Sequence, residues 1–76
     1  MEMKLLKIIN VILNKKGTNI NELVASCSLR KDLGMDSLDL AELTVRIEDE
    51  FDVDIFEDGV IDTINEVMEK INRGNE

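Results

Sequence analysis

One stretch of the chain has the pattern of a loop that becomes a helix: Leu33-Gly34-Met35-Asp36-Ser37-Leu38-Asp39-Leu40-Ala41-Glu42-Leu43. Gly34 gives the backbone freedom just before the helix start. Asp36 is a favourable N-cap, because its carboxylate can accept a hydrogen bond from a free amide of the first turn. Ser37 then occupies the first helical position, where unpaired amides and the positive end of the helix dipole favour an anion. A phosphate ester on Ser37 would therefore lie in a favourable field. The sequence has no second phosphate-binding loop, so we expect a covalently attached phosphate.

The order Asp-Leu-Gly-Met-Asp-Ser-Leu at residues 32–38 resembles the attachment site of the acyl carrier proteins. The resemblance extends loosely over the whole chain and includes Asp39, Glu42, Glu48, Asp49 and Phe51. In that family the serine of Asp-Ser-Leu carries 4′-phosphopantetheine, which comes from coenzyme A and whose thiol holds acyl groups as thioesters. The resemblance implies that Ser37 is the attachment point and that Asp36 contacts a metal ion in the complex with the phosphopantetheinyl transferase. The simpler interpretation is that Asp36 and Ser37 only cap a helix.

The composition indicates a small acidic domain. The chain has 76 residues, which we interpret as a single domain over residues 1–76 with a small core. Its net charge of -8 argues against nucleic-acid and anionic-membrane partners, and favours proteins with basic docking patches. There is no histidine, and the lone Cys27 excludes an intramolecular disulfide and a multi-cysteine metal site. Without a signal peptide or a membrane-spanning run, we expect a cytoplasmic protein, most simply a monomer.

The sequence of the first half of the chain predicts one helix followed by one long loop. Apolar residues at helical spacing predict a helix from about Met3 to Lys15, which Gly17 should stop. From Thr18 to Met35 the sequence is irregular. Ile20, Leu23 and Val24 suggest a short helical turn there, and Leu29 and Leu33 are expected to anchor the loop to the core. Loops this long are uncommon in compact domains unless they are functional. We interpret Cys27 as structural or incidental rather than reactive.

The second helix, from Asp36 or Ser37 to Glu50, has two apolar stripes. One predicts core contact and comprises Leu40, Leu43, Ile47 and Phe51. The other lies on nearly the opposite side, comprises Leu38, Ala41 and Val45, and is flanked by carboxylates. This second stripe predicts a docking surface for an enzyme with an apolar groove and a basic rim. By resemblance, the docking residues are Leu38, Asp39, Glu42, Val45, Glu48 and Asp49. The alternative is that these apolar residues are scattered on the surface, as is common.

The last third of the chain predicts a loop and a closing helix. Residues 52–59 form a loop or a short helix, and the family pattern there is longer and often has proline at the position of Phe56. A capping box from Thr63 to Glu66 begins the last helix, which ends near Gly74. We therefore predict an all-α fold of three to four helices, acyl-carrier-like, with a long loop between the first two. By resemblance the acyl chain would slip between helices. The candidate pocket residues are Leu40, Leu43, Ile47, Phe56, Ile61 and Met68. Taken one at a time, each is better explained as ordinary core.

The leading hypothesis is a carrier for acyl intermediates in fatty acid biosynthesis, which is a substrate for other enzymes rather than an enzyme. A dedicated carrier for a polyketide, peptide or surface-polymer pathway is the alternative. A calcium site over residues 52–65 fits poorly, because neither register of its carboxylates satisfies an EF-hand loop, and we expect no dedicated metal site. An unmodified helical interaction module is a further alternative. A stand-alone enzyme is disfavoured, because the chain lacks histidine and any nucleophile-base pair.

Overall fold

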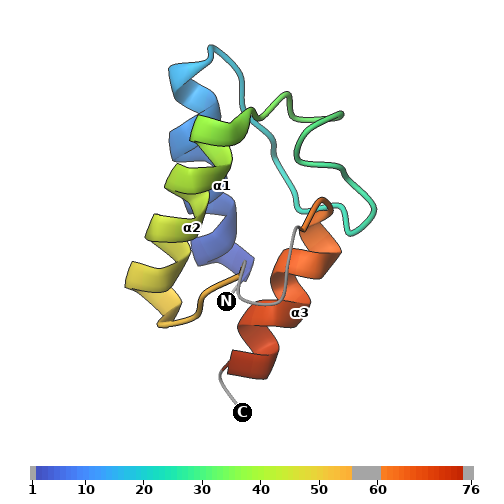
Figure 1. Ribbon diagram of the computed structural model, residues 1–76. Helices are drawn as coiled ribbons and strands as arrows, with labels where there is room; N and C mark the ends of the chain where they lie inside the picture. Colours follow the sequence, from blue (N-terminus) through green and yellow to red (C-terminus); the bar gives the residue numbers. More distant parts are fainter. Residues whose placement is uncertain (1, 56–60, 75–76) are drawn as a thin grey trace.

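The computed structural model describes residues 2–55 and 61–74. These residues form three α-helices, which are α1 (Glu2–Lys15), α2 (Ser37–Phe51) and α3 (Ile64–Gly74). α1 and α2 run antiparallel side by side, and α3 lies beside them (Figure 1). The predicted all-α bundle is confirmed, as is the long connection between α1 and α2.

The core is formed by the apolar face of each helix. All three helices contribute fully or almost fully buried side chains, which are Leu5, Ile9, Ile12, Leu13, Leu40, Leu43, Ile47, Ile64, Val67 and Ile71. The predicted core stripe of α2 is confirmed at three of its positions, whereas Phe51 is half-buried and packs against the same cluster. Burial of these side chains is the main favourable contribution to folding, at about 1.5–3 kcal/mol for each large one.

α1 ends where the sequence predicts. Gly17 has a left-handed backbone with φ of 83°. Its amide donates to the carbonyl of Asn14 at 3.1 Å, and the amide of Thr18 donates to the carbonyl of Leu13 at 3.1 Å. This pair of bonds is a Schellman motif, which satisfies two carbonyls at the end of the helix. The glycine lets the chain leave α1 without the steric cost that a side chain would bring at this φ.

The long loop between α1 and α2 has no helix over Ile20, Leu23 and Val24, so the predicted helical turn is wrong. The side chain of Asn10 explains why. Its Nδ2 donates to the carbonyl of Ile20 at 2.9 Å, and its Oδ1 accepts from the amide of Ile20 at 2.8 Å. Both backbone polar groups of Ile20 are therefore paired across the molecule with α1. Leu29 is fully buried and Leu33 is half-buried against the core, which confirms both as anchors.

The same loop is hydrogen-bonded to the start of α3, and we call this contact the loop–α3 junction (residues 25–32 with residues 62–65). The amide of Leu29 donates to the carbonyl of Asp62 at 2.7 Å, and the amides of Ile64 and Asn65 donate back to the loop, each at 3.0 Å. Figure 1 shows the loop turning back along the first turn of α3. The buried Ser28 hydroxyl donates to Asp62 Oδ1 at 2.8 Å. The junction ties the segment that precedes Ser37 to the third helix.

The described residues between α2 and α3 are not helical. Asp52 ends α2 in a left-handed conformation with φ of 58°, and its amide donates to the carbonyl of Glu48. Val53 and Ile55 are buried. The loop or short helix predicted for residues 52–59 lies in part outside the described residues, and so does Phe56. The capping box is confirmed, because Glu66 Oε1 accepts from the amide of Thr63 at 3.1 Å and Thr63 Oγ1 accepts from the amide of Glu66 at 3.2 Å.

Candidate functional site

Ser37 is the first residue of α2, and Asp36 is its N-cap. Asp36 Oδ1 accepts from the amide of Asp39 at 2.9 Å, while Asp39 Oδ2 accepts from the amide of Asp36 at 3.2 Å. This is a capping box in which aspartate replaces the usual glutamate. It fixes the direction in which α2 begins, and it leaves the amides of Ser37 and Leu38 without a bond from the cap.

The Ser37 side chain is exposed, whereas Met35 before it and Leu40 after it are buried. Met35 is only 3% exposed, and its amide donates to the carbonyl of Leu29 at 2.9 Å. Gly34, which directly precedes Met35, has φ of 70°, a left-handed conformation that is unfavourable for residues other than glycine. Met35 and Leu40 therefore hold the serine from either side of the helix start. The result is an accessible hydroxyl at a defined position, where the helix dipole favours negative charge.

Asp39 is paired with a lysine from the end of α1. Lys16 Nζ lies 2.8 Å from Asp39 Oδ2. The hydrogen bond from Lys16, aided by one from the backbone of Asp36, lowers the pKa of Asp39 below its ordinary value. The same bond raises the pKa of Lys16, to which the nearby charge of Asp36 also contributes. A basic side chain therefore already occupies this carboxylate beside Ser37.

Glu42 is paired with two cations. Lys15 Nζ and Arg46 Nε each lie 2.8 Å from Glu42 Oε2. Hydrogen bonds from Lys15 and then Arg46 lower the pKa of Glu42. Sequence reasoning placed Lys15 only at the end of its own helix. It missed the pair of Lys15 with Glu42, and likewise those of Lys16 with Asp39 and of Lys4 with Glu50. The sequence carries little signal for these pairs, because they depend on the antiparallel packing of α1 and α2 rather than on local spacing.

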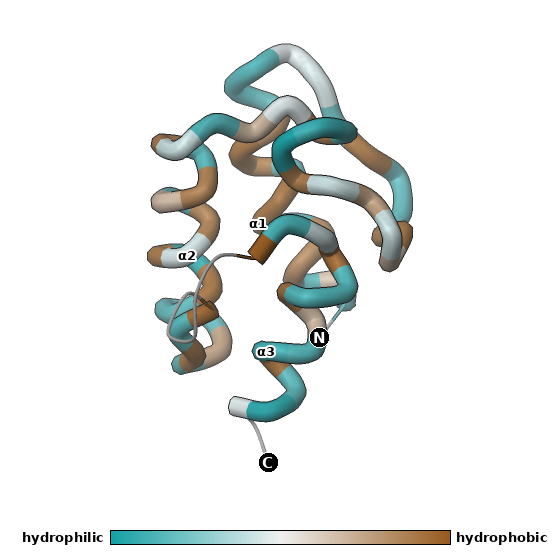
Figure 2. Tube along the Cα trace, turned by 45° about the vertical axis from the view of Figure 1, so that its right-hand side comes forward, coloured by the Kyte–Doolittle hydropathy of each residue, from teal (hydrophilic) through white to brown (hydrophobic). Residues whose placement is uncertain are grey.

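The outer face of α2 carries the predicted second apolar stripe. Leu38 is 80% exposed and Val45 is 65% exposed. Figure 2 shows apolar positions on the outer edge of α2 as well as on its inner side. A shallow hollow at the far end of this face is lined by Val45, Glu48, Asp49 and Asp52. The six predicted docking residues thus all lie along α2, but two of their carboxylates are engaged within the chain, and the docking role itself stays a prediction.

The predicted acyl-pocket residues lie together in or against one core. Leu40, Leu43, Ile47 and Ile61 are buried members of the same apolar cluster, and Met68 is half-buried against it. Phe56 lies outside the described residues. These positions bring α2 next to the segment that leads into α3. An acyl chain entering there would have to displace packed side chains, so the pocket stays a prediction.

Cys27 is half-buried, and burial raises the pKa of its thiol, with a further contribution from the charge of Asp32. The thiol is therefore protonated and weakly nucleophilic at neutral pH. Residues 2–55 and 61–74 contain no group of three or more cysteine, aspartate or glutamate side chains arranged to hold a metal ion. None of the helices in that part of the chain is long and apolar enough to cross a membrane.

Comparison with known families fits this geometry. The family described as "Phosphopantetheine attachment site" matches residues 4–71. The chain belongs to this family. It is a phosphopantetheine carrier, and members of the family hold 4′-phosphopantetheine covalently. Carrier domains of this kind are typically not catalytic. The predicted resemblance and cofactor are confirmed. No solved structure matches the chain.

Proposed function

We propose that the Ser37 hydroxyl is the attachment point, and that the chain carries acyl groups as thioesters from one enzyme to another. The single observation that carries this proposal is the exposed serine at the first position of α2, inside an Asp-Ser-Leu sequence within the matched region. The attached group supplies the thiol that binds the acyl cargo. The chain supplies a rigid, accessible anchor and a surface that partner enzymes recognise.

The attachment step uses the oxygen of Ser37. A phosphopantetheinyl transferase binds coenzyme A, and Ser37 Oγ forms a bond to the phosphorus next to pantetheine while the bond to the nucleotide phosphate breaks. The hydroxyl proton passes to a base of the transferase, and the nucleotide leaves with its phosphate. Ser37 therefore needs no activating base of its own, which suits a chain without histidine. Asp36, adjacent and exposed, is proposed to contact the metal ion of that complex.

Some of the charges around Ser37 favour a phosphodiester there, and others oppose it. The start of α2 is favourable to an anion, typically by 0.3–1 kcal/mol at an exposed site. Asp36 and Asp39 oppose it, but Lys16 is held against Asp39 and offsets one of these two negative charges. A covalent link suits such a site, because this field alone does not supply the affinity to retain a free phosphate group.

We propose acyl intermediates of fatty acid biosynthesis as the cargo, with a dedicated polyketide, peptide or surface-polymer carrier as the alternative. The test is purification from the native host, followed by hydroxylamine release and mass spectrometry of the cargo. An aliphatic acyl hydroxamate from wild type and none from Ser37→Ala supports the fatty acid proposal, and an aminoacyl product supports the alternative. If Ser37→Ala keeps full pathway activity, the chain acts without modification and the carrier proposal fails.

A further inference from the structure

The acidic face of α2 is divided into two halves of different local charge. In the first half, Asp39 and Glu42 are surrounded by three cations at 2.8 Å, so this group carries a formal charge of +1. The cations are Lys15, Lys16 and Arg46. We call this set of five residues the cation clamp. A basic residue of a partner enzyme that approaches here meets no net attraction, because the carboxylates are already paired.

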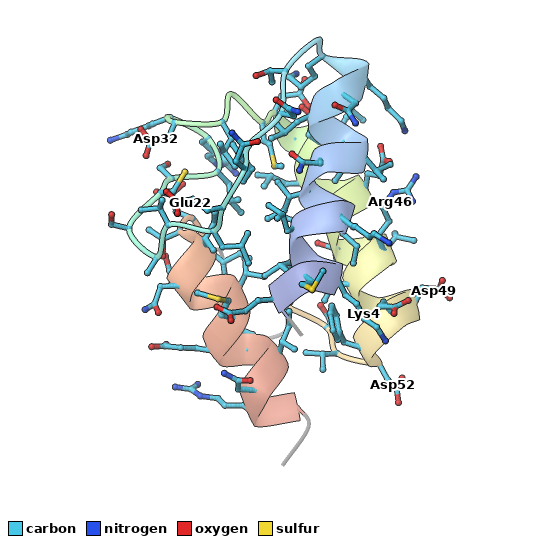
Figure 3. All side chains as sticks on the ribbon, turned by 180° about the vertical axis from the view of Figure 1, so that it is seen from behind. Lys4, Glu22, Asp32, Arg46, Asp49 and Asp52 are labelled. Atoms are coloured by element: carbon cyan, nitrogen blue, oxygen red, sulfur yellow. The ribbon has the colours of Figure 1, made fainter. Side chains whose placement is uncertain are left out.

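In the second half of the face, Glu50 is paired with Lys4 Nζ at 3.0 Å, whereas the other three carboxylates are open. Glu48, Asp49 and Asp52 are exposed, and no ion pair within residues 2–55 and 61–74 involves their side chains. Together with the exposed Val45, they line the hollow described above. Figure 3 shows Asp49 and Asp52 pointing away from the protein at the C-terminal end of α2, with Arg46 nearer the middle of the helix. Three negative charges next to an apolar side chain suit an arginine or lysine whose aliphatic stem packs on Val45.

We propose that the cation clamp moves the docking of basic partner enzymes away from Asp39 and Glu42 and onto Val45, Glu48, Asp49 and Asp52. Lys15 and Lys16 are then specificity-determining residues, because they compete with the partner's cations for the two carboxylates nearest Ser37. The occupant is a partner enzyme with a basic patch, and the transferase is the first such partner. The inference rests on the proposed function, since it concerns how enzymes reach Ser37.

The competition has a second consequence. Glu48 follows Glu42 by six residues, about 9 Å along the helix, so a partner cation bound at Glu48 or beyond lies near the screening length of about 8 Å from Glu42 at physiological salt. Neutralising Glu42 should therefore have little effect on a partner docked at the hollow. Removing the charges of Lys15 and Lys16 changes the formal charge of the first half from +1 to -1. A second place for a basic partner to bind is then open.

The test measures kcat/KM of a phosphopantetheinyl transferase for the apo chain with saturating coenzyme A. Glu42→Gln and Glu48→Gln form a matched pair, because each replaces a glutamate of α2 and each changes the net charge by one. We expect Glu48→Gln to lower kcat/KM about two- to fivefold, mainly through KM, as for loss of an exposed ion pair. We expect Glu42→Gln to leave kcat/KM nearly unchanged. Circular dichroism and melting curves establish that each variant is folded.

A double variant tests the clamp itself. Lys15→Gln/Lys16→Gln should raise kcat/KM about two- to fivefold, and in this background Glu42→Gln should lower it again. Lys7→Gln/Lys31→Gln, which changes the net charge equally at two exposed lysines away from the clamp, should give a smaller increase. The inference is overturned if Glu42→Gln costs as much as Glu48→Gln, or if the clamp variant matches the Lys7/Lys31 control. Failure of the proposed function looks different, because then no variant is modified at all.

Discussion

Replacement of Ser28 by alanine should destabilise the protein by about 2 kcal/mol through the loop–α3 junction. The Ser28 residue is 7% exposed, and its hydroxyl makes two bonds. It donates to Asp62 Oδ1 at 2.8 Å and accepts from the amide of Lys31 at 3.1 Å. A hydrogen bond to a charged group contributes about 1.5–3 kcal/mol and a neutral one about 0.5–1.5 kcal/mol. Because Asp62 is only half-buried, water can replace part of the lost hydrogen bonding, so the expected loss of stability is about 2 kcal/mol.

The assay is urea and thermal unfolding followed by circular dichroism at 222 nm. For a domain of this size, about 2 kcal/mol corresponds to a fall of about 8 to 16 °C in Tm. The matched control is Ser26→Ala, which removes an exposed hydroxyl from the same loop and should change stability by less than about 0.5 kcal/mol.

A double-mutant cycle with Asp62→Ala assigns the effect to this contact. If the hydroxyl and the carboxylate stabilise each other, the two substitutions together should cost at least about 1 kcal/mol less than the sum of the single costs. A Ser28→Ala variant as stable as Ser26→Ala would show that the Ser28 hydroxyl does not stabilise the junction. Additive effects of Ser28→Ala and Asp62→Ala would show that the two side chains do not stabilise each other. The first result would mean that the backbone bonds of the junction act without help from this hydroxyl.

Two further predictions concern the core and the effect of pH. Leu43→Ala should lower the free energy of unfolding by about 2–5 kcal/mol, because Leu43 is fully buried. Leu38→Ala on the same helix should lower it by less than about 0.5 kcal/mol, because Leu38 is exposed. Equal losses of the two variants in denaturant unfolding would contradict the assigned faces of α2. Amide hydrogen bonds from Thr63 and then Asp62 lower the pKa of Glu66, so its stabilising contribution is present above the ordinary value of 4.5 and is lost as pH falls through the lower folded pKa. The stability difference between wild type and Glu66→Gln should therefore shrink from pH 7 to pH 3, and a constant difference would show that ionised Glu66 does not stabilise the cap.

The helices and the start of α2 could be predicted because their signals are local. The apolar spacing of Leu5, Ile9 and Ile12 defines one face of α1, and the Schellman motif at Gly17 needs only the glycine and the residues just before it. The N-cap at Asp36 depends on residues within one turn. Exposure of Ser37 follows from its place before the first buried residue of the helix. These features involve contacts between near neighbours in sequence.

Most of the contacts that sequence reasoning missed join distant parts of the chain. Ser28 and Asp62 are 34 residues apart, and Lys15 and Glu42 are 27 residues apart. No periodicity reports such pairs, because they depend on how the helices and the loop pack. The wrong helical turn at Ile20 has the same origin, since the side chain of Asn10 pairs both of its backbone groups. Local propensity there was overridden by a tertiary contact.

These distant contacts also change how the docking surface is interpreted. From the sequence, Asp39, Glu42, Glu48 and Asp49 are equivalent acidic residues of one helix. In the structure, the first two are paired with cations, and the other two are not paired within residues 2–55 and 61–74. Their helix is the same, but their electrostatic environments differ. Lys15 and Lys16, at and just after the end of α1, pair with Asp39 and Glu42, whereas Lys4 at the start of α1 pairs with Glu50 and leaves Glu48 and Asp49 open.

We propose that Ser37 carries the 4′-phosphopantetheine group, and intact mass spectrometry shows whether it does. Apo wild type and Ser37→Ala are each incubated with coenzyme A, Mg²⁺ and a phosphopantetheinyl transferase of broad specificity. We predict that wild type gains the mass of one 4′-phosphopantetheine group, located by peptide mapping on the fragment that contains Ser37, and that Ser37→Ala keeps its mass. An unchanged wild-type mass, or the same gain in Ser37→Ala, would contradict the claim.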